Sequence, residues 1–414
     1  MTDFEAHSVQ KRTQNGSAGT STPPKSGSES GIGSVLAGDG QFSVTVEPVG
    51  EVQDLAARWR VLEAQSDRSF FLSWTWISTW LSQVKSPVFL VSVHAPTPRD
   101  GPSDIALGLF GTSVERRHGV LPVRQLILHS NGEASLDAIT IEYNNLLMAR
   151  GYEQSVWPSV LSHLKSQTQI SWREMIVPGA LAAKINALEP AFARSYTRSR
   201  SGSWRIDLAT LRDNGIRERD SFISTLSKNA RGQIRRAFRR YEEFGEVRLE
   251  KASSMEDAKS FFAAMGKLNS EKWIACGREP IMDNSAFVNF HQQLIETGFS
   301  QGSIEMLCAK AGERHIGWLY NFCDRGRVLF YFSGFPAEQD NQLKPGLVTQ
   351  VLAIEAHLKG DASVYDFMAG DDRYKQTLGA RGPEIITIGF QQSDPLLTLE
   401  ALARRLKASF RALR

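Results

Sequence analysis

Residues 327–335 read RVLFYFSGF, residues 344–360 read KPGLVTQVLAIEAHLKG, and residues 364–379 read VYDFMAGDDRYKQTLG. The first block is dense in aromatic and β-branched side chains, which predicts a buried strand. The second predicts a helix that opens at Lys344-Pro345-Gly346, since proline near the first helical position loses no hydrogen bond. The third predicts a second strand that ends in a glycine-bearing turn and leads into a short helix. Together the blocks predict a βαβ unit.

The start of the predicted helix is a candidate anion site. The amides of Gly346 and Leu347 precede the first hydrogen bonds inside the helix, so they are available to an outside acceptor. In a βαβ unit the strand that follows can line the ligand. The pattern predicts a phosphate-bearing ligand and leaves its identity open.

The composition is that of a globular protein without a strong nucleic-acid signature. The 414 residues are enough for two domains with full cores. Hydrophobic residues make up 41% and charged residues 22%, which is typical of a folded globular chain. The formal net charge of +3 is too small to favour a nucleic-acid partner.

The cysteines and the apolar runs bear on the compartment. Cys276, Cys308 and Cys323 share no metal-ligand spacing, so no metal is predicted, and their odd number argues against a disulfide framework. A reducing compartment is the simplest interpretation. No apolar run approaches the roughly 20 residues that span a bilayer, and residues 1–12 lack the order of a signal peptide. We therefore expect a cytoplasmic protein.

Shifts in composition divide the chain into four predicted parts. Residues 1–40 are rich in Ser, Gly and Thr and predict a disordered tail, passive rather than regulatory. The polar run Arg194–Gly202 is interpreted as a link, which separates an N-terminal domain at 41–200 from a C-terminal domain at 201–393. Residues 394–414 predict a basic amphipathic helix. This helix would lie either on an anionic membrane surface or back on the protein.

A second basic helix is predicted over residues 226–245. Its polar face carries Arg231, Arg235 and Arg239, which are spaced four residues apart. Arginines in this arrangement can bind phosphates or anionic headgroups. A solvated basic face is the alternative.

Two further segments leave alternatives open. Residues 69–83, SFFLSWTWISTWLSQ, place aromatic side chains at helical spacing, so the tryptophans either pack between layers or wall an acceptor pocket. Asp137 and Glu142 precede a strand predicted near residues 145–148. These acids are either solvated or face a cleft.

Several familiar chemistries are absent from the sequence. It contains no P-loop, HExxH or GxSxG motif, no zinc-type Cys/His cluster, and no GxGxxG motif after a predicted strand. What remains is a fold that binds phosphate through backbone amides and uses few dedicated catalytic side chains.

The order of these segments resembles the GNAT-type acyltransferases associated with bacterial cellulose and exopolysaccharide biosynthesis. Those are similar to the Fem-type peptidoglycan aminoacyltransferases, which carry two GNAT-like halves. The resemblance covers about residues 42–392. Its most specific part is a DFxxGDxxYKxxxG pattern, matched by Asp366, Phe367, Gly370, Asp371, Tyr374, Lys375 and Gly379. The resemblance implies an α/β (α+β) fold of two tandem GNAT-like domains, with mixed central sheets flanked by helices.

The resemblance also implies a donor and its site. The donor would be acetyl-CoA or another acyl-CoA, with its pyrophosphate at Lys344, Gly346 and Leu347. No metal takes part. The acceptor would be a sugar or sugar nucleotide, whose phosphate could meet Arg231, Arg235 and Arg239, and Asp371 is a further candidate for binding the substrate.

Three side chains of the pattern are candidates for the chemistry. Acyl transfer to an amine requires removal of a proton and stabilisation of an oxyanion. Asp366, at the end of a core strand, would orient or deprotonate the acceptor, or else hydrogen-bond neighbouring amides. Tyr374 would protonate the thiolate or pack in the helix. Lys375 would stabilise the oxyanion, hold an acceptor phosphate, or lie on the surface.

Three functions stay open at the level of sequence. The leading hypothesis is an N-acyltransferase that acts on an amino-sugar precursor or lipid-linked intermediate of a surface polysaccharide, with peripheral contact at the inner membrane face. The second is a tRNA-dependent aminoacyltransferase of the Fem type. The third is a catalytically degenerate regulator that binds cyclic-di-GMP, since Arg231, Arg235 and Arg239 form overlapping RxxxR patterns.

Overall fold

The computed structural model describes residues 42–95 and 103–412, with side chains as far as residue 404. The predicted tail at residues 1–40 therefore lies outside the described residues. So do the side chains from residue 405 onward in the predicted amphipathic helix at 394–414.

The first half of the chain ends with residue 193, and the second half begins with residue 194. The elements of the first half are β1 (Ser43–Pro48), α1 (Val52–Ala64), η1 (Phe70–Leu72), α2 (Trp74–Gln83), β2 (Val88–Ala95), β3 (Ser103–Arg117), β4 (Leu121–Leu128), α3 (Ala134–Asp137), β5 (Leu147–Met148), α4 (Val156–Ser166), β6 (Glu174–Leu181), α5 (Ala182–Ile185) and η2 (Asn186–Ala191). The elements of the second half are β7 (Arg194–Asp207), α6 (Leu208–Asp213), α7 (Arg219–Thr225), α8 (Lys228–Glu242), β8 (Val247–Lys251), α9 (Met255–Ala275), η3 (Ile281–Asp283), α10 (Ser285–Gly298), β9 (Ile304–Ala311), β10 (Arg314–Asp324), β11 (Arg327–Gly334), α11 (Pro345–Lys359), β12 (Val364–Ala369), α12 (Arg373–Leu378), β13 (Ala380–Gln391) and α13 (Pro395–Ala412).

The predicted βαβ unit is confirmed as β11, α11 and β12. Pro345 occupies the start of α11, as the helix-start pattern predicts. β11 and β12 pair in parallel from Arg327 with Val364 to Leu329 with Asp366. Local sequence was enough here, because a buried strand, a proline start and an apolar helix each have a strong short-range signature.

Over the described residues the two halves share one 13-stranded sheet, in the order β1-β2-β3-β4-β6-β13-β7-β12-β11-β10-β9-β8, with β5 attached to β3. The sheet is mixed, since β4 pairs with β6 in parallel while β7 and β13 are antiparallel. The predicted α/β class with helices on the sheet faces is confirmed.

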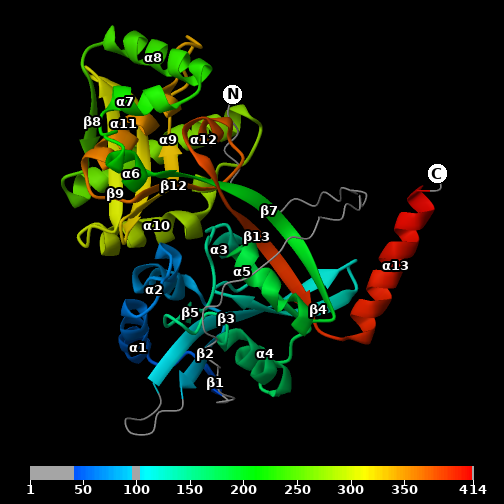
Figure 1. The fold of residues 1–414 in the computed structure, drawn as a ribbon. Helices are drawn as coiled ribbons and strands as arrows, with labels where there is room; N and C mark the ends of the chain where they lie inside the picture. Colours follow the sequence, from blue (N-terminus) through cyan, green and yellow to red (C-terminus); the bar gives the residue numbers. More distant parts are fainter. Residues whose placement is uncertain (1–41, 96–102, 413–414) are drawn as a thin grey trace, which may run out of the picture.

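The prediction of a polar link at Arg194–Gly202 is wrong, because this run forms most of strand β7. β13 pairs with β7 from Ala380 with Arg205 to Gln391 with Arg194, and it pairs with β6 on its other side. Figure 1 shows β7 and β13 as long strands that run together between the halves. The polar side chains fit a strand because they find partners on the sheet surface, as Arg198 does with Glu115 at 3.0 Å. The proposed domain boundary at residue 200 falls inside β7.

Helices cover both faces of the second half. Apolar side chains of α6, α7, α8 and α11 share one core on one face. Those of α9 and α10 share a different core, which also contains side chains of α1 and α2 from the first half. Trp76 of α2 packs edge-on against Phe290 of α10 at 4.8 Å between ring centroids. The halves are therefore joined by a common apolar core as well as by the sheet.

The tryptophans of residues 69–83 belong to this common core. Trp74, Trp76 and Trp80 are 8%, 2% and 5% exposed. The interpretation of the segment as an aromatic packing helix is confirmed. None of these three tryptophans is among the residues that line the cavity described below.

Helices α9 and α10, which contribute the second half's side chains to the common core, each begin at a recognisable capping residue. Ser254 and Asp257 form a capping box at the start of α9. Asn284 caps α10, and its side-chain amide also donates to the carbonyl of Ser135 in the first half at 2.7 Å. The start of α10 is thus fixed against the first half.

The C-terminal helix α13 stands apart from the body of the protein in Figure 1. Its first turns are anchored, since Leu397 is buried and Glu400 pairs with Arg117 at 3.3 Å. Leu399 and Leu402 are 62% and 49% exposed, so the described part of the apolar stripe is not packed on the protein. Within the described ranges, no helix combines the length and apolar character needed to cross a bilayer.

Candidate active site

A β-bulge opens the sheet where the parallel strands β11 and β12 part. Tyr320 of β10 pairs with Phe332 and Asn321 pairs with Phe330, so Tyr331 is the extra residue of β11. The last ladder pair between the parallel strands joins Leu329 to Asp366. Bulges of this kind redirect side chains and are frequent next to active sites.

A cavity of about 90 Å³ lies at this opening. Strand residues on its wall are Phe330, Tyr331 and Phe332 of β11 and Phe367, Met368 and Ala369 of β12. Helices α9 and α10 add Asn269, Trp273 and Phe287, and the segment after α3 adds Ala138, Thr140 and Glu142. The cavity is therefore built from both halves of the chain.

The carboxyl group of Glu142 is the acid on this wall. Glu142 is 7% exposed, and its Oε2 accepts a hydrogen bond of 2.9 Å from the backbone N–H of Ala369. Burial raises the pKa of Glu142 to about 7, while the Ala369 amide and the charge of Lys375 act in the opposite direction. The group is thus both a proton donor and a proton acceptor near neutral pH.

Lys375 of α12, a candidate site residue from the sequence, lies on the same wall. It is 3% exposed, its ammonium donates to the carbonyl of Ala369, and Asp372 Oδ2 lies 3.9 Å from Nζ. Burial lowers the pKa of Lys375, against the attraction of Asp372 and Glu142. The surface alternative for this lysine is excluded by its burial.

Asp366 is engaged in a network beside the cavity rather than on its wall. Its carboxylate accepts from the Tyr143 hydroxyl at 2.9 and 3.0 Å and from Arg327 at 2.7 Å. The backbone N–H of Met368 adds a bond of 2.8 Å. The structure thus places Asp366 where it ties β12 to the first half. Asp366 is not among the residues that line the cavity, and its contact with the acceptor stays a prediction.

Backbone strain gathers at the same place. Tyr143 and Met368 have φ angles of 54° and 60°, which non-glycine residues rarely adopt. Tyr143 follows Glu142 in sequence, and Met368 precedes Ala369. Strained residues of this kind persist where the surrounding structure holds them, and they cluster at functional sites.

Tyr374 is not among the residues that line the cavity, and its role in the chemistry stays a prediction. Its ring lies 6.5 Å from that of Phe330 and 6.0 Å from that of Phe367, within the core shared with α11. Its hydroxyl is buried without a hydrogen-bond partner among the described residues. Successive helical residues are turned by about 100°, so a helix that directs Lys375 to the cavity turns Tyr374 elsewhere.

The start of α11 is arranged as the sequence predicts. The Val348 N–H donates to the Lys344 carbonyl at 3.0 Å, so the amides of Gly346 and Leu347 come before the first bond of the helix. The loop that leads to Lys344 is held by Asp340, which pairs with Arg240 of α8 at 2.9 Å. Binding of an anion at these amides stays a prediction.

The arginines of α8 lie away from the cavity. The guanidinium of Arg231 donates to the Leu226 carbonyl at 2.9 Å, and that of Arg235 donates to Ser224 Oγ at 3.3 Å. Arg239 is exposed. α8 packs in the core of α11, on the face opposite α9 and α10. Asp371 is also exposed, at the turn before α12.

Residues 228–376 match the profile of a family described as an acetyltransferase (GNAT) domain. This span holds the bulge, the parallel strands, the start of α11 and Lys375. The chain carries a GNAT acetyltransferase domain. Its enzyme class is that of an acyltransferase. No curated protein matches the chain.

Solved structures place the GNAT domain in a larger fold. FemX superposes with a TM-score of 0.53 at 12% identity, covering 85% of this chain and 99% of its own. A tandem GNAT protein from the clavulanic acid biosynthesis pathway gives 0.40 at 11% identity, covering 85% and 99%. The C-terminal domain of a putative lysylphosphatidylglycerol synthetase from Agrobacterium fabrum gives 0.45 at 10%, covering 84% and 95%. The FemX likeness establishes a shared fold. The other two superpose too loosely to carry an argument.

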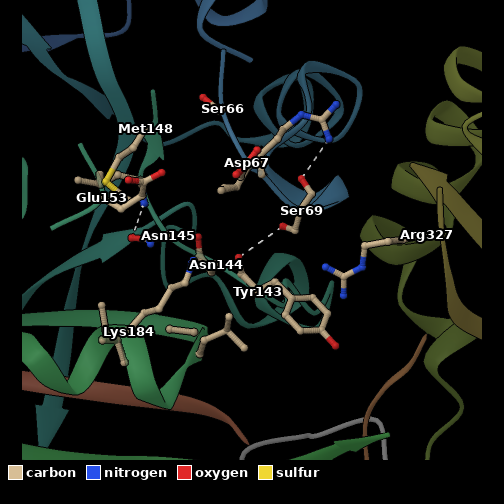
Figure 2. Close-up of a pocket in the computed structure, with 16 residues that line it drawn as sticks. Ser66, Asp67, Ser69, Tyr143, Asn144, Asn145, Met148, Glu153, Lys184 and Arg327 are labelled. Atoms are coloured by element: carbon tan, nitrogen blue, oxygen red, sulfur yellow. Dashed lines mark hydrogen bonds between the residues drawn. The ribbon is translucent and has the colours of Figure 1, made fainter. Parts of the chain in front are cut away.

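A second cavity borders the GNAT domain on the other side of Tyr143. It measures about 120 Å³ and is lined by residues of both halves, among them Ser69, Asn144, Lys184 and Arg327 (Figure 2). The Ser69 hydroxyl donates to the Tyr143 carbonyl at 3.4 Å, and the Arg327 guanidinium lies 5.3 Å from the centre of the Tyr143 ring. Adjacent residues of one loop thus face different cavities, Glu142 one and Tyr143 the other.

Metal ligation has no visible basis in the part of the chain that the structure describes. No group of three or more His, Cys, Asp or Glu side chains there could hold a metal ion.

The site contains one residue that the sequence left open and two that it gave no reason to single out. The sequence left open whether Glu142 is solvated or faces a cleft. The structure places Glu142 on the cavity wall, which supports the cleft. Tyr331 looked like any aromatic residue of a buried strand, because a bulge leaves no local signature in YFSG. Asn269 sits in the middle of α9, where a polar residue on the buried face was the available signal.

Proposed function

We propose that this chain transfers an acyl group from acetyl-CoA, or another acyl-CoA, to the amino group of a sugar-type acceptor in bacterial surface-polysaccharide synthesis. The observation that carries the proposal is the buried Glu142 carboxyl, with a pKa near 7, at the opening between β11 and β12 of the GNAT domain. Because acyl-CoA and nucleotide sugars are cytoplasmic metabolites, the reaction would take place in the cytoplasm, as the sequence predicts.

Glu142 fits the role of general base. An amine attacks a thioester only after losing its proton, and a base is most effective when its pKa is close to the working pH. The bond from the Ala369 amide fixes the direction of the carboxylate. We assign proton removal from the acceptor nitrogen to Glu142.

Lys375 fits the role of electrostatic partner. Its ammonium is buried on the cavity wall, where a charge acts more strongly than in water. An oxyanion that forms on the acyl carbon would gain from this charge, as other acyl-transfer sites gain from fixed donors. The strained peptide at Met368 positions the Ala369 carbonyl that holds the lysine.

The donor would enter along the parallel strands. Ligands of α/β folds bind beyond the carboxyl ends of parallel strands, next to a helix start. Gly346 and Leu347 supply free amides there, and Lys344 adds a positive charge for the pyrophosphate. The thioester would then reach the opening at the bulge.

The acceptor would lie against α9. Asn269 is 7% exposed, and its Oδ1 has no hydrogen-bond partner among the described residues although it lines the cavity. A buried acceptor oxygen without a partner is costly, so a substrate hydroxyl or amide N–H would satisfy it. Trp273 offers an aromatic face beside it, which suits the apolar face of a sugar ring.

The test uses the purified full chain, acetyl-CoA and a panel of nucleotide-linked amino sugars. We expect release of CoA and an acylated sugar detected by mass. Glu142→Gln should reduce kcat/KM by about a hundredfold or more, the usual contribution of a general base. Glu153→Gln is the matched control, because Glu153 lines the second cavity, and it should keep its activity.

Two outcomes would contradict the proposal. One is the absence of acylated product with every donor and acceptor of the panel. The other is equal activity of Glu142→Gln and the wild type, or a loss confined to Glu153→Gln, which would move the chemistry to the second cavity.

The fold likeness to FemX favours one second candidate, aminoacyl transfer from charged tRNA. The same assay decides it when aminoacyl-tRNA replaces acetyl-CoA as the donor. Product formation from aminoacyl-tRNA alone would replace the proposal above. Binding of cyclic-di-GMP by Arg231, Arg235 and Arg239 stays a prediction, without a link to the cavity. Contact with the inner membrane through residues 394–414 also stays a prediction.

A further inference from the structure

The first turns of helix α13 are fixed to the body of the protein. Asp394 caps the helix, since its Oδ1 accepts from the Leu396 N–H at 2.8 Å, and its Oδ2 pairs with Arg173 at 3.0 Å. The guanidinium of Arg194 donates to the Leu397 carbonyl at 3.3 Å. Several contacts therefore set the direction in which α13 leaves the body beyond the end of β13 (Figure 1).

A buried ion-pair network completes this anchor. The side chain of Glu400, in the second turn of the helix, is 7% exposed, and its carboxylate lies 3.3 Å from the guanidinium of Arg117. Arg117 is itself buried and pairs with the fully buried Glu174 at 2.6 Å. A buried charge is costly without its partner. Rotation of α13 about its axis would separate Glu400 from Arg117 and is therefore unfavourable.

The anchor turns the apolar stripe of α13 away from the protein. An α-helix turns by about 100° per residue, so Leu399 and Leu402 lie about 200° and 140° around the helix from the buried Leu397. Both leucines are exposed, as this geometry requires. The sequence continues the spacing at Leu406 and Phe410. The body of the protein is thus on the wrong side of the helix to cover the stripe.

The charge of the segment indicates which partner the stripe fits. Glu400 is the one acid of residues 395–414 and is turned inward to Arg117. The same residues carry five basic side chains, Arg404, Arg405, Lys407, Arg411 and Arg414. Two copies of the helix laid stripe to stripe would bring these charges together without acidic partners, which is destabilising. An anionic surface would attract them instead.

We propose that α13 docks the chain on an anionic lipid surface. Helices with leucine or phenylalanine on one side and lysine or arginine on the other lie in the plane of a membrane, with the apolar side at the boundary of headgroups and acyl chains. The basic residues of α13 then meet the lipid phosphates. The buried anchor makes the helix a fixed mount rather than a loose tail, so the body is held at a set orientation to the surface. Docking does not depend on the acyl transfer proposed above.

The test is sedimentation of the purified full chain with lipid vesicles. Vesicles of phosphatidylglycerol mixed with phosphatidylcholine are compared with vesicles of phosphatidylcholine alone. We expect the chain to bind the anionic vesicles at least about tenfold more tightly. This preference should be lost in 1 M salt, where the Debye length falls to about 3 Å. Equal binding to both kinds of vesicle, or binding to neither, would overturn the inference.

Replacement of the apolar stripe has a matched control. Leu399→Ser combined with Leu402→Ser should weaken binding to anionic vesicles by about tenfold or more, because two leucines no longer enter the lipid. Val52→Ser combined with Val61→Ser removes two exposed apolar side chains of α1 and should bind as the wild type does. All four side chains are exposed, so thermal unfolding should change little. Wild-type binding by the leucine variant would overturn the inference, since the attachment would then be electrostatic alone.

The contribution of charge is tested in the same way. Arg405→Gln combined with Lys407→Gln should weaken binding to anionic vesicles by about tenfold and leave binding to neutral vesicles unchanged. Arg235→Gln combined with Arg239→Gln is the control, because it removes two charges from the other basic helix, α8. A loss confined to the α8 variant would overturn the inference by moving the contact to that helix.

Sedimentation velocity without lipid examines the other possible occupant, a second copy of the chain. We expect the wild type and the variant with Leu399→Ser and Leu402→Ser to have the same mass in solution. A wild-type dimer that becomes a monomer in this variant would show that the stripe pairs with itself, and it would overturn docking on lipid.

Discussion

At the scale of the residue, the proposed chemistry of this chain depends on a few buried polar groups that cannot all be read from local sequence. Glu142 and Lys375 are each nearly inaccessible to water, and burial moves the pKa of the acid up and that of the base down. Each group is thereby brought closer to its neutral form, which is the cost of placing charges in a dry site. The same burial makes Glu142 useful as a base near neutral pH.

The raised pKa of Glu142 has a consequence for stability and rate. The ordinary value is 4.5 and the folded value is about 7, so between them the folded state binds more protons than the unfolded state. This contribution to the free energy of unfolding is therefore present at low pH and lost as the pH rises towards 7. We expect kcat/KM to rise with pH and level off above about 7, while this part of the stability falls.

Glu142→Gln separates the two effects. Glutamine cannot ionise, so the variant should lose the acid limb of the rate profile together with most of its activity. It should also be more stable than the wild type above pH 7, as measured by urea unfolding. An acid limb that persists in Glu142→Gln would assign it to another group.

At the scale of the element, the cavity depends on how closely helix α9 approaches strand β11. A Cβ at Gly334 would lie 2.6 Å from the Met265 Cα and 2.9 Å from the Met265 carbonyl oxygen. Backbone atoms cannot move aside as a side-chain end can. Gly334 is therefore required for the contact that brings Asn269, one helical turn beyond Met265, onto the cavity wall.

Gly334→Ala tests this approach. We expect it to lower the free energy of unfolding by about 1–3 kcal/mol, as overpacking of a tight contact does, and to weaken acceptor binding, seen as a higher KM. Gly346→Ala is the matched control. Its nearest neighbour would be a carbon of Phe335 at 3.5 Å, an ordinary contact, so its stability should not fall. A similar loss in both variants would contradict the steric argument.

At the scale of the whole molecule, the halves are parts of one folding unit. β13 is the last strand along the sequence, yet it lies inside the sheet, between β6 and β7, and pairs with both. Asp366 of β12 holds Tyr143 of the first half, next to Glu142. The span that matches the GNAT domain ends at residue 376, before β13, and it lacks Glu142.

We therefore expect a fragment of residues 201–414 to be inactive in acyl transfer and to self-associate. Cutting at residue 201 divides β7 and leaves β13 without β6, which exposes unpaired strand edges and the core shared with α1 and α2. Size-exclusion chromatography and the acyl-transfer assay check both points. A monomeric, active fragment would show that the second half folds without the first half and that Glu142 is not the base.

The sequence by itself determined the local elements of this protein and the half of the site that one βαβ unit carries. The proline start of α11 and the strands beside it followed from short-range patterns, because backbone and side-chain preferences act within a few residues. Lys375 was a candidate only through the family resemblance of the DFxxGDxxYKxxxG pattern, and it lines the cavity. The tertiary structure alone decided that Arg194–Gly202 is a strand. It also decided that Tyr374 packs against the core shared with α11, and that the bulge in β11 brings Tyr331 to the cavity. It also decided that Glu142 faces the second half. These outcomes depend on partners far away in the chain, since a strand needs neighbours to pair with and a buried charge needs a whole cavity to shift its pKa.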